Sequence, residues 1–399
     1  MKPPRWKSLV VVYLLGVLAM YATVCWNTRR LIAAGLPDFA IYYCAGAVVR
    51  QGLGHQLYDA GARFQVQQQF ATNVPLFRGP LPWTHPPFET LFFAPFSSFS
   101  YLTAYALWNV FNLILVGLVL WLMSPHLAEL RARGPALWLL AIAFFPVFFN
   151  LLEGQDGIVL LFLYAAAYVF LKKDRDAAAG AFLAVGLFKF HLILPFVLLL
   201  LLQKRWKILY GFVPVSILAV MSSIAIAGIR ALWAYPRYVF YWEDVLAATD
   251  RVPAGMPNLR GLMYVFLPDW RYGPAVVLLF SIAIFVFAAW RCRLANSSTS
   301  FDLSFSLALL ATVLVSYHVV SYDLSVLLIP IFLLANHLLK EQSPHQRSAV
   351  VIACGIALLF LSPLHLLLSL QYKEYALMGF ILLFWMYGIA EAPLVRGQD

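Results

Sequence analysis

Long apolar runs separated by short basic segments dominate the pattern of this chain. The first run extends from Ser8 to Thr28, and later runs cover approximately residues 101–123, 135–150, 157–171, 177–188, 192–202, 208–228, 273–290, 303–317, 324–338, 348–369 and 375–390. A bilayer-spanning helix needs about 20 mostly apolar residues, and several of these runs are shorter. Short runs of this kind are typical of helices that end inside a cavity of a membrane protein. We predict an all-α polytopic membrane protein, one domain over residues 1–399, with about 10–12 transmembrane helices.

Two polar stretches are too long and too polar to cross a membrane, and we expect both on the outer side. The first outer loop covers residues 27–100 and the second covers residues 229–272. In the first loop, Asp38 stands where an N-cap is expected, because Asp favours that position. Apolar residues then recur at helical spacing until Gln51-Gly52, which predicts an amphipathic helix lying at the membrane interface.

The composition agrees with a membrane protein and excludes several other classes. Apolar residues make up 63% of the chain and charged residues 12%, against about 25% charged residues in soluble proteins. Disorder is excluded because it requires low hydropathy and high charge. The net charge of +10 is best explained by topology and anionic lipid, since no basic stripe with interleaved aromatic residues predicts nucleic-acid binding.

The positions of the basic residues predict which loops face the cytoplasm. More than half of the 28 Lys and Arg residues fall in short segments that alternate with longer outer loops: Lys2, Arg5, Lys7, Arg131, Arg133, Lys172, Lys173, Arg175, Lys204, Arg205, Lys207, Arg291, Arg293, Lys340, Arg347 and Arg396. The positive-inside rule then places the N-terminus in the cytoplasm. The first run is long and lacks a small-residue cleavage site, so we expect it to be retained as a helix.

Residues 177–202 allow either one long span or a hairpin. Both flanks are strongly basic, with Lys172-Lys173 on one side and Lys204-Arg205 on the other. Two basic flanks favour a hairpin with both ends inside and its tip, around Lys189, on the outer side. A lysine at such a tip also has a simpler interpretation, in which its apolar stem stays in the membrane and its amine reaches the headgroups.

With this topology, the polar residues at the outer side become the candidates for function. Ionisable groups at or near membrane depth are costly and point to function by default. The outer set comprises Asp38, His55, Asp59, His85, Glu89, Glu153, Gln155, Asp156, Lys189, His191, His318 and Asp323. Each could instead be an ordinary solvated helix end, and for Asp38 that alternative is a plain N-cap.

Several short motifs, in a consistent order over nearly the whole chain, carry a family resemblance. They are Asp38-x3-Tyr42-Tyr43-x-Ala45, Leu57-Tyr58-Asp59, His85-Pro86-Pro87-Phe88, Gly154-Gln155-Asp156-Gly157, the segment from Gly180 to Lys189, and Ser316-Tyr317-His318. The set resembles glycosyltransferase family 87, polyprenyl-phosphate-sugar-dependent mannosyltransferases of the GT-C type. His85 and Asp156 depart from the family pattern, which has an aromatic residue and more commonly Asn at these places.

The resemblance implies an enzyme that moves a hexose, by family default mannose, from a polyprenyl-phosphate donor to a glycolipid or glycan acceptor on the outer face of a bacterial plasma membrane. Asp38 matches the catalytic carboxylate and would act as base in an inverting single displacement. Donor-phosphate contacts are expected from Lys189, His191, Arg260 and His318. Sugar or acceptor contacts are expected from Gln155, Asp156, Tyr42 and His85.

Some alternatives remain open at this point. A transporter or flippase for a lipid-linked sugar explains the spans but not a long first outer loop with Asp38, and a membrane scaffold would not need so many ionisable residues. We expect no cofactor, although Glu153 and Asp156 leave a divalent metal open. A disulfide between Cys25 and Cys44 is weakly supported. Aromatic residues that either line a groove for the polyprenyl tail or form an interfacial belt are Trp83, Phe88, Phe92, Phe93, Phe96 and Tyr101.

Overall fold

The computed structural model of the chain describes residues 5–71, 82–132, 136–250, 252–268, 270–293, 298–340 and 346–392. All regular elements in these ranges are helical. The α-helices are α1 (Arg5–Ala33), α2 (Phe39–Arg50), α3 (Ala60–Gln68), α4 (Thr90–Phe93), α5 (Tyr101–Met123), α6 (Ala128–Arg131), α7 (Ala136–Ala143), α8 (Phe145–Glu153), α9 (Gly157–Lys172), α10 (Asp176–Val185), α11 (Phe190–Leu202), α12 (Leu209–Ala227), α13 (Ile229–Asp250), α14 (Leu259–Phe266), α15 (Gly273–Arg293), α16 (Ser298–Val315), α17 (Leu328–Lys340), α18 (Gln346–Leu359), α19 (Ser362–Leu366) and α20 (Met378–Glu391). This confirms the prediction of an all-α chain.

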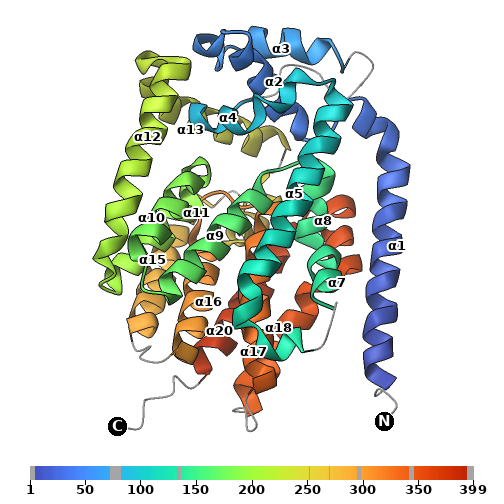
Figure 1. Ribbon diagram of the computed structural model, residues 1–399, viewed down its shortest axis with the longest axis vertical. Helices are drawn as coiled ribbons and strands as arrows, with labels where there is room; N and C mark the ends of the chain where they lie inside the picture. Colours follow the sequence, from blue (N-terminus) through green and yellow to red (C-terminus); the bar gives the residue numbers. More distant parts are fainter. Residues whose placement is uncertain are drawn as a thin grey trace.

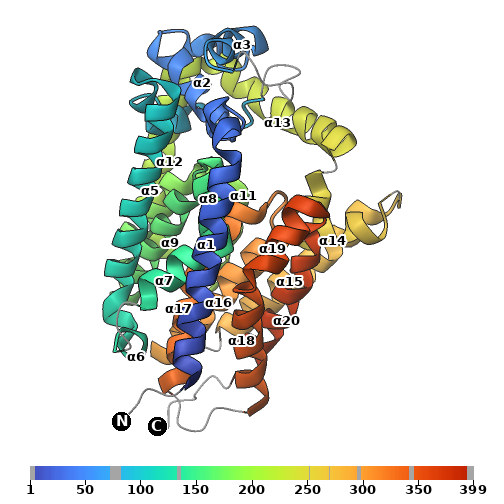
Figure 2. The same cartoon turned by 90° about the vertical axis from the view of Figure 1, so that its right-hand side faces the viewer.

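The long helices run roughly side by side, and the helices of the first outer loop cover one end of the bundle (Figure 1). Helix α1 lies along one flank and α12 along the other, while α2 and α3 lie across the top. Figure 2 shows α13 leaving this same end and slanting toward α14. Asp38 therefore lies at the end of the molecule opposite the beginning of α1.

Six helical runs in the described ranges are long and apolar enough to cross a membrane: Ser8–Ala33, Tyr101–His126, Asp176–Leu202, Trp206–Ala227, Gly273–Arg293 and Ser321–Lys340. Of these, Asp176–Leu202 consists of α10 and α11, which form the hairpin described below. A bent pair, Arg347–Leu359 with Ser362–Gln371, makes a seventh if it is counted as one span. These runs confirm a polytopic membrane protein. They number fewer than the ten to twelve expected, and four further apolar helices in the described ranges, α9 and α20 among them, are shorter.

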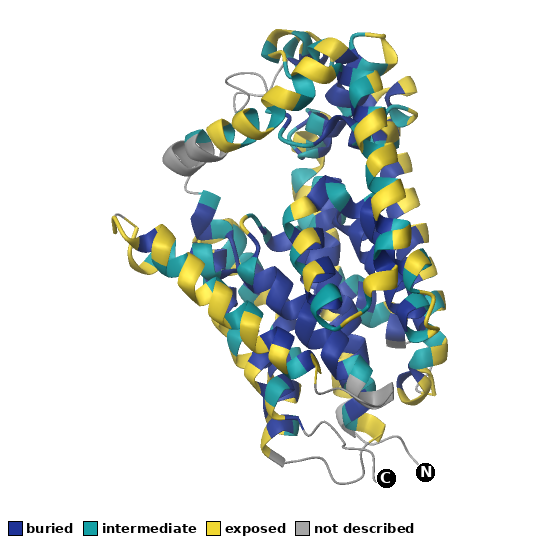
Figure 3. Cartoon of the chain, turned by 90° about the vertical axis from the view of Figure 1, so that its left-hand side faces the viewer, coloured by how far each residue is buried: buried dark blue, intermediate teal, exposed yellow. Residues whose placement is uncertain are grey.

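Burial separates a tightly packed interior from an apolar surface (Figure 3). Helix α9 is buried on nearly all sides, as expected for a helix whose residues are apolar all round. By contrast, α1, α12 and α15 expose many large apolar side chains. Exposed apolar surface of this extent is what a helix in contact with lipid needs, because lipid tails replace water as its neighbour.

The segment from Asp176 to Leu202 is a hairpin. Arg205, just after α11, forms an ion pair of 2.8 Å with Asp176 at the start of α10 and donates a hydrogen bond to the carbonyl of Leu171. A straight helix of this length would hold its ends about 40 Å apart. The contact therefore confirms that the chain folds back at its tip, the 3-10 turn Gly186–Lys189.

Several of the loops predicted to face the cytoplasm meet one another at the end opposite α2. Arg291 donates hydrogen bonds to the carbonyls of Ala390 and Ala392, and Arg293 donates one to the carbonyl of Leu202. Contacts among these basic segments agree with the expectation that they share one side. Lys2, Arg133 and Arg396 lie outside the described residues.

The predicted outer loops contain more helix than expected. Helix α1 continues to Ala33, so the first loop begins later than residue 27. Helix α2 has the predicted bounds, and α13 and α14 occupy most of residues 229–272. Cys25 and Cys44 are both free, so the disulfide left open between them is not formed.

Candidate active site

A cavity of about 1030 Å³ lies below α2, bounded by α13 and by the turn Ser321–Leu327. Seven of the nine site residues expected from the sequence line it: Asp38, Tyr42, His85, Gln155, Lys189, His191 and His318. They come from segments far apart in the chain, so the fold brings them together. Asp156 and Arg260 are not among the residues that line the cavity.

Asp38 occupies the N-cap position of α2, but its side chain does not cap the helix. Its Oδ2 atom accepts a hydrogen bond of 2.7 Å from Nε2 of Gln155. Oε1 of the same Gln155 accepts a hydrogen bond of 2.6 Å from the hydroxyl of Tyr42. The plain N-cap interpretation of Asp38 is therefore wrong, because a tertiary contact holds its carboxylate toward the cavity.

The backbone around Gln155 explains how it reaches Asp38. Gly154 ends α8 in the left-handed conformation, with a φ of 63°, which favours glycine. A Cβ atom at this position would lie 2.6 Å from Cβ of Phe39 in α2, so only glycine permits the close approach. The indole of Trp108 donates a hydrogen bond to the carbonyl of Gln155. Trp108 therefore holds the backbone of Gln155, while the side-chain amide lies between Tyr42 and Asp38.

Lys189, at the tip of the hairpin, is buried and ion-paired. Its Nζ lies 2.8 Å from Oδ1 of Asp156 and 2.6 Å from Oδ1 of Asp323. A snorkelling lysine would place its amine among headgroups, so that interpretation is wrong. Asp156 is likewise committed to Lys189 behind the cavity wall, which does not fit the expected contact with a sugar.

Two of the other residues expected to contact phosphate, His191 and His318, lie in the cavity wall, and the third, Arg260, lies beside it. Nδ1 of His191 forms a hydrogen bond of 2.8 Å with Oγ of Ser316, and its ring centre is 6.0 Å from that of His318. These two imidazoles therefore form a pair in the cavity wall. Arg260 stacks over the ring of Tyr317 at 4.1 Å and donates to its carbonyl, which places the guanidinium beside the cavity.

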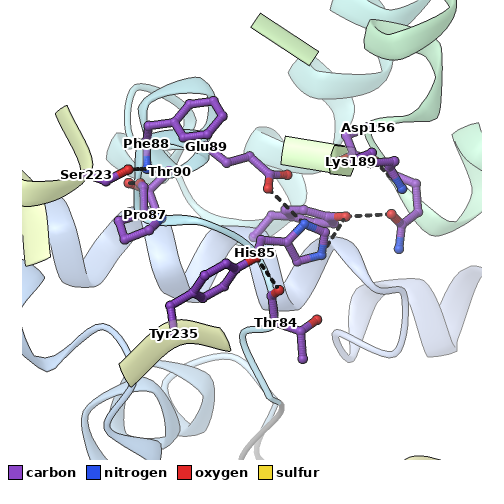
Figure 4. Close-up of polar contacts among 12 residues, drawn as sticks. Thr84, His85, Pro87, Phe88, Glu89, Thr90, Asp156, Lys189, Ser223 and Tyr235 are labelled. Atoms are coloured by element: carbon purple, nitrogen blue, oxygen red, sulfur yellow. Dashed lines mark hydrogen bonds and ion pairs between the residues drawn. The ribbon is translucent and has the colours of Figure 1, made fainter. Parts of the chain in front are cut away.

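His85 and Glu89 form a second polar contact on the segment that leads into α4. Nδ1 of His85 lies 2.8 Å from Oε2 of Glu89, and Figure 4 shows the two groups turned toward each other. The other ring nitrogen of His85 is 3.5 Å from the hydroxyl of Tyr42. His85 thus connects the cavity wall to a fully buried carboxylate.

Burial changes the pKa values of three groups in and beside the cavity. It raises the pKa of Asp38, while the hydrogen bond from Gln155 acts in the opposite direction. It lowers the pKa of His85 to about 4, so this imidazole is neutral at pH 7. Burial, together with the charge of Asp156, holds the pKa of Glu89 well above its usual range.

The tertiary structure gives partners in the site to Tyr322, which the sequence did not single out, and to Asp323 and Glu89, which it listed as outer candidates without a role. Tyr322 forms a hydrogen bond with Asp38, and its ring lies 5.2 Å from Nζ of Lys189. Asp323 holds Lys189. Both residues lie within five positions after the Ser316-Tyr317-His318 motif, which was the available signal. Glu89 stands four residues after His85, a spacing that could have indicated their contact.

The aromatic residues proposed for a lipid groove mostly belong to the core. Trp83 and Phe93 are fully buried and pack against Tyr42, and none of the six residues lines the cavity. The cavity has a different aromatic wall, formed by Phe188, Phe190, Tyr235, Phe240 and Tyr317. Of the two interpretations left open for these residues, a groove along residues 83–101 is therefore not part of this cavity.

Comparison with protein families decides the class of the chain. Residues 83–316 match the model of glycosyltransferase family 87. The chain belongs to glycosyltransferase family 87. No curated protein and no solved structure matches it. The family membership makes the chain a membrane glycosyltransferase and implies a lipid-linked sugar donor.

The family 87 match covers only part of the cavity wall. His85, Gln155, Lys189 and His191 lie within the matched residues, whereas Asp38 and His318 lie outside them. The glycosyltransferase assignment therefore does not rest on Asp38. The evidence for Asp38 comes from the cavity itself.

Proposed function

We propose that this protein transfers a hexose, mannose, from a polyprenyl-phosphate donor to a glycolipid or glycan acceptor by an inverting single displacement. The reaction takes place on the outer face of a bacterial plasma membrane. One observation carries the proposal: the Asp38 carboxylate lies in the same cavity as Lys189 and the His191–His318 pair. A base and groups suited to a phosphate are thus available to one substrate pair.

Asp38 acts as the general base in this proposal. An acceptor hydroxyl is a poor nucleophile, and a carboxylate within hydrogen-bonding reach can remove its proton as it attacks. The acceptor oxygen forms a bond to the anomeric carbon, and the bond from that carbon to the phosphate oxygen breaks with its electron pair. One essential carboxylate suffices, unlike in glycosidases, which use two. Gln155 fixes one oxygen of Asp38 and so sets the direction of proton transfer.

The polyprenyl phosphate that leaves carries developing negative charge. Fixed donors and cations in a site of low dielectric stabilise such charge strongly. Lys189 is held rigidly by Asp156 and Asp323, and the rings of His191 and His318 stand beside it on the cavity wall. In this arrangement the imidazoles contact the phosphate, while the Lys189 ammonium sets the local potential.

The polyprenyl tail requires an apolar path out of the cavity. Helix α13 provides Tyr235, Val239 and Phe240 to the cavity wall, and Phe240 is also well exposed on the surface of the molecule. A wall that is apolar inside and continues to an exposed apolar surface lets the tail leave toward lipid. This path replaces the groove expected along residues 83–101.

The proposal is tested by transfer of radiolabelled mannose from polyprenyl-phosphate-mannose to endogenous acceptors in membranes that contain the protein. Wild type is compared with Asp38→Asn, with Asp59→Asn as the matched control in the same loop. We expect labelled product with wild type and Asp59→Asn only. Full activity of Asp38→Asn would reject Asp38 as the base. Movement of intact donor across sealed vesicles without product would favour a flippase instead.

A further inference from the structure

The wall of the cavity contains a compact group of potential metal ligands behind His85. One ligand atom from each of His85, Glu89 and Asp156 lies within 4.8 Å of the other two. Glu89 and Asp156 are completely buried, whereas His85 reaches the cavity. The three side chains therefore converge on one point that is closed on the protein side and approachable from the cavity.

The backbone holds this group without help from a ligand. Pro86 and Pro87 lead into the 3-10 turn Pro87–Glu89, which turns the Glu89 side chain back toward His85 (Figure 4). Tyr58 donates a hydrogen bond of 2.9 Å to the carbonyl of His85, and Tyr235 donates one of 3.1 Å to the carbonyl of Thr84. The segment is thus tied to α13 and to the end of the loop before α3, which keeps the His85 ring in place.

The carboxyl group of Glu89 has two close neighbours but no hydrogen bond of normal geometry. Neither of its oxygens accepts such a bond from any described residue, and its contacts are with Nδ1 of His85 at 2.8 Å and with the carboxyl group of Asp156. Buried polar groups are almost always satisfied, since leaving one without a partner is costly. This side chain points into the same group of atoms, so a ligand bound there would satisfy its oxygens.

The local charges also leave room for a cation. Lys189 pairs with Asp156 and Asp323 together, so one ammonium already faces two carboxylates. Glu89 adds a third carboxyl group, 2.8 Å from Nδ1 of His85. Either a proton on Glu89 or a bound cation must offset this excess of negative charge.

The chemistry of the three ligands suits a divalent cation. Carboxylate oxygens are ligands for Mg²⁺, Ca²⁺ and Mn²⁺, and an imidazole nitrogen shifts the preference toward transition metals. A ligating histidine usually engages its second ring nitrogen in a hydrogen bond, and here Nε2 of His85 faces the hydroxyl of Tyr42 at 3.5 Å. Mn²⁺ accepts this mixture of nitrogen and oxygen, with water completing its coordination.

We propose that Nδ1 of His85, the Glu89 carboxylate and the Asp156 carboxylate bind one divalent cation of the Mn²⁺ class in the cavity wall. The cation neutralises Glu89 and binds Nδ1 of a His85 ring that the backbone already holds at the cavity surface. This site differs from the pair left open in the sequence, because Oε2 of Glu153 instead faces the backbone nitrogen of Asp38. The proposal does not depend on the identity of the transferred sugar.

Binding of Mn²⁺ to the purified full-length protein, after removal of metals with a chelator, tests the proposal directly. Free Mn²⁺ is counted by electron paramagnetic resonance, so the readout needs no activity. We expect wild type and the control Glu153→Gln to bind one Mn²⁺ per chain, and Glu89→Gln and Asp156→Asn to bind none. Tyr42→Phe should weaken binding about 10-fold, as the loss of a group behind a metal ligand usually does.

Two further readouts guard against variants that fail to fold. In wild type, the pulsed electron paramagnetic resonance spectrum of bound Mn²⁺ should show coupling to the nitrogen of a coordinated imidazole. His85→Gln should abolish this nitrogen coupling. Added Mn²⁺ should raise the Tm of wild type but not that of Glu89→Gln. If folded wild type binds no Mn²⁺, Zn²⁺ or Mg²⁺, or if Glu89→Gln binds as well as wild type, the proposal is wrong and a proton neutralises Glu89.

Discussion

Two aspartates of the first outer loop stand at the same position relative to a helix but differ in their tertiary contacts. Asp59 precedes α3 with an extended backbone, and its Oδ1 accepts hydrogen bonds from the backbone nitrogens of Gly61 and Ala62. Asp38 precedes α2 with a helical backbone and makes no cap. Its carboxylate instead accepts a hydrogen bond from Gln155, 117 residues away.

The difference shows what separates a structural aspartate from a candidate catalytic one. A capping aspartate satisfies itself from its own helix, so its carboxylate is not available to a substrate. Asp38 is held by groups from α8–α9 and from the turn at Tyr322, and it lines the cavity. Local sequence cannot distinguish the two cases, because both show Asp just before a helix.

The largest expected effect separates these two residues by activity. Asp38→Asn should lower kcat by about 10²–10⁴-fold, the usual contribution of a general base, whereas Asp59→Asn should leave it unchanged. Initial rates of sugar transfer from saturating donor measure this. Equal losses in both variants would remove the distinction between a capping and a catalytic aspartate.

The next effect concerns the buried cation near Asp38. Lys189→Met leaves Asp156 and Asp323 buried without their partner, which should cost about 3–5 kcal/mol of stability. Thermal unfolding in detergent measures the loss. Adding Asp323→Asn should recover part of it, because one unpaired charge is removed. A lysine that only contacted headgroups would show a small change in both variants.

A smaller effect is expected from the group that orients Asp38. Gln155→Leu removes a hydrogen bond to a charged group, worth about 1.5–3 kcal/mol, so kcat should fall about 10–10²-fold with little change in KM. Burial raises the pKa of Asp38 and the Gln155 hydrogen bond lowers it. Loss of Gln155 therefore raises that pKa further.

The pH profile of Gln155→Leu tests whether the pKa of Asp38 rises when the hydrogen bond is removed. The base must be ionised, so activity is lost as the pH falls through the pKa of Asp38. The acidic limb of kcat/KM should lie above the ordinary aspartate pKa of about 3.9 in wild type, and at still higher pH in Gln155→Leu. A limb that moves to lower pH would show that Gln155 does not stabilise the ionised form.

The smallest effect belongs to the capping aspartate. Asp59→Ala should reduce stability by about 1 kcal/mol through the lost N-cap of α3, with activity unchanged. Differential scanning calorimetry of the variant and of wild type measures this change in stability. A loss of several kcal/mol would show that Asp59 has tertiary partners and is not a local cap.

The sequence predicted the helices and loops better than the contacts between them. Helix α2, the hairpin around Lys189 and the basic loops follow from periodicity and charge, which are local or additive signals. The partners of Lys189 could not be predicted from the sequence. Asp323 is 134 residues away, and a separation of that length does not indicate which residues come into contact. The sequence left the place of the aromatic residues from Trp83 to Phe96 open for the same reason, since an apolar side chain suits a core, an interfacial belt and a lipid groove equally well.

By itself, the sequence determined that this chain is an all-helical membrane protein, and it selected a short set of polar residues at the predicted outer side as candidates for function. Hydropathy and charge settle this, because the cost of placing charge in lipid constrains every residue separately. Only the tertiary structure decided which of those residues share a cavity. Hydrogen bonds, such as that between Gln155 and Asp38, act over about 3 Å, and only folding brings distant parts of the chain that close.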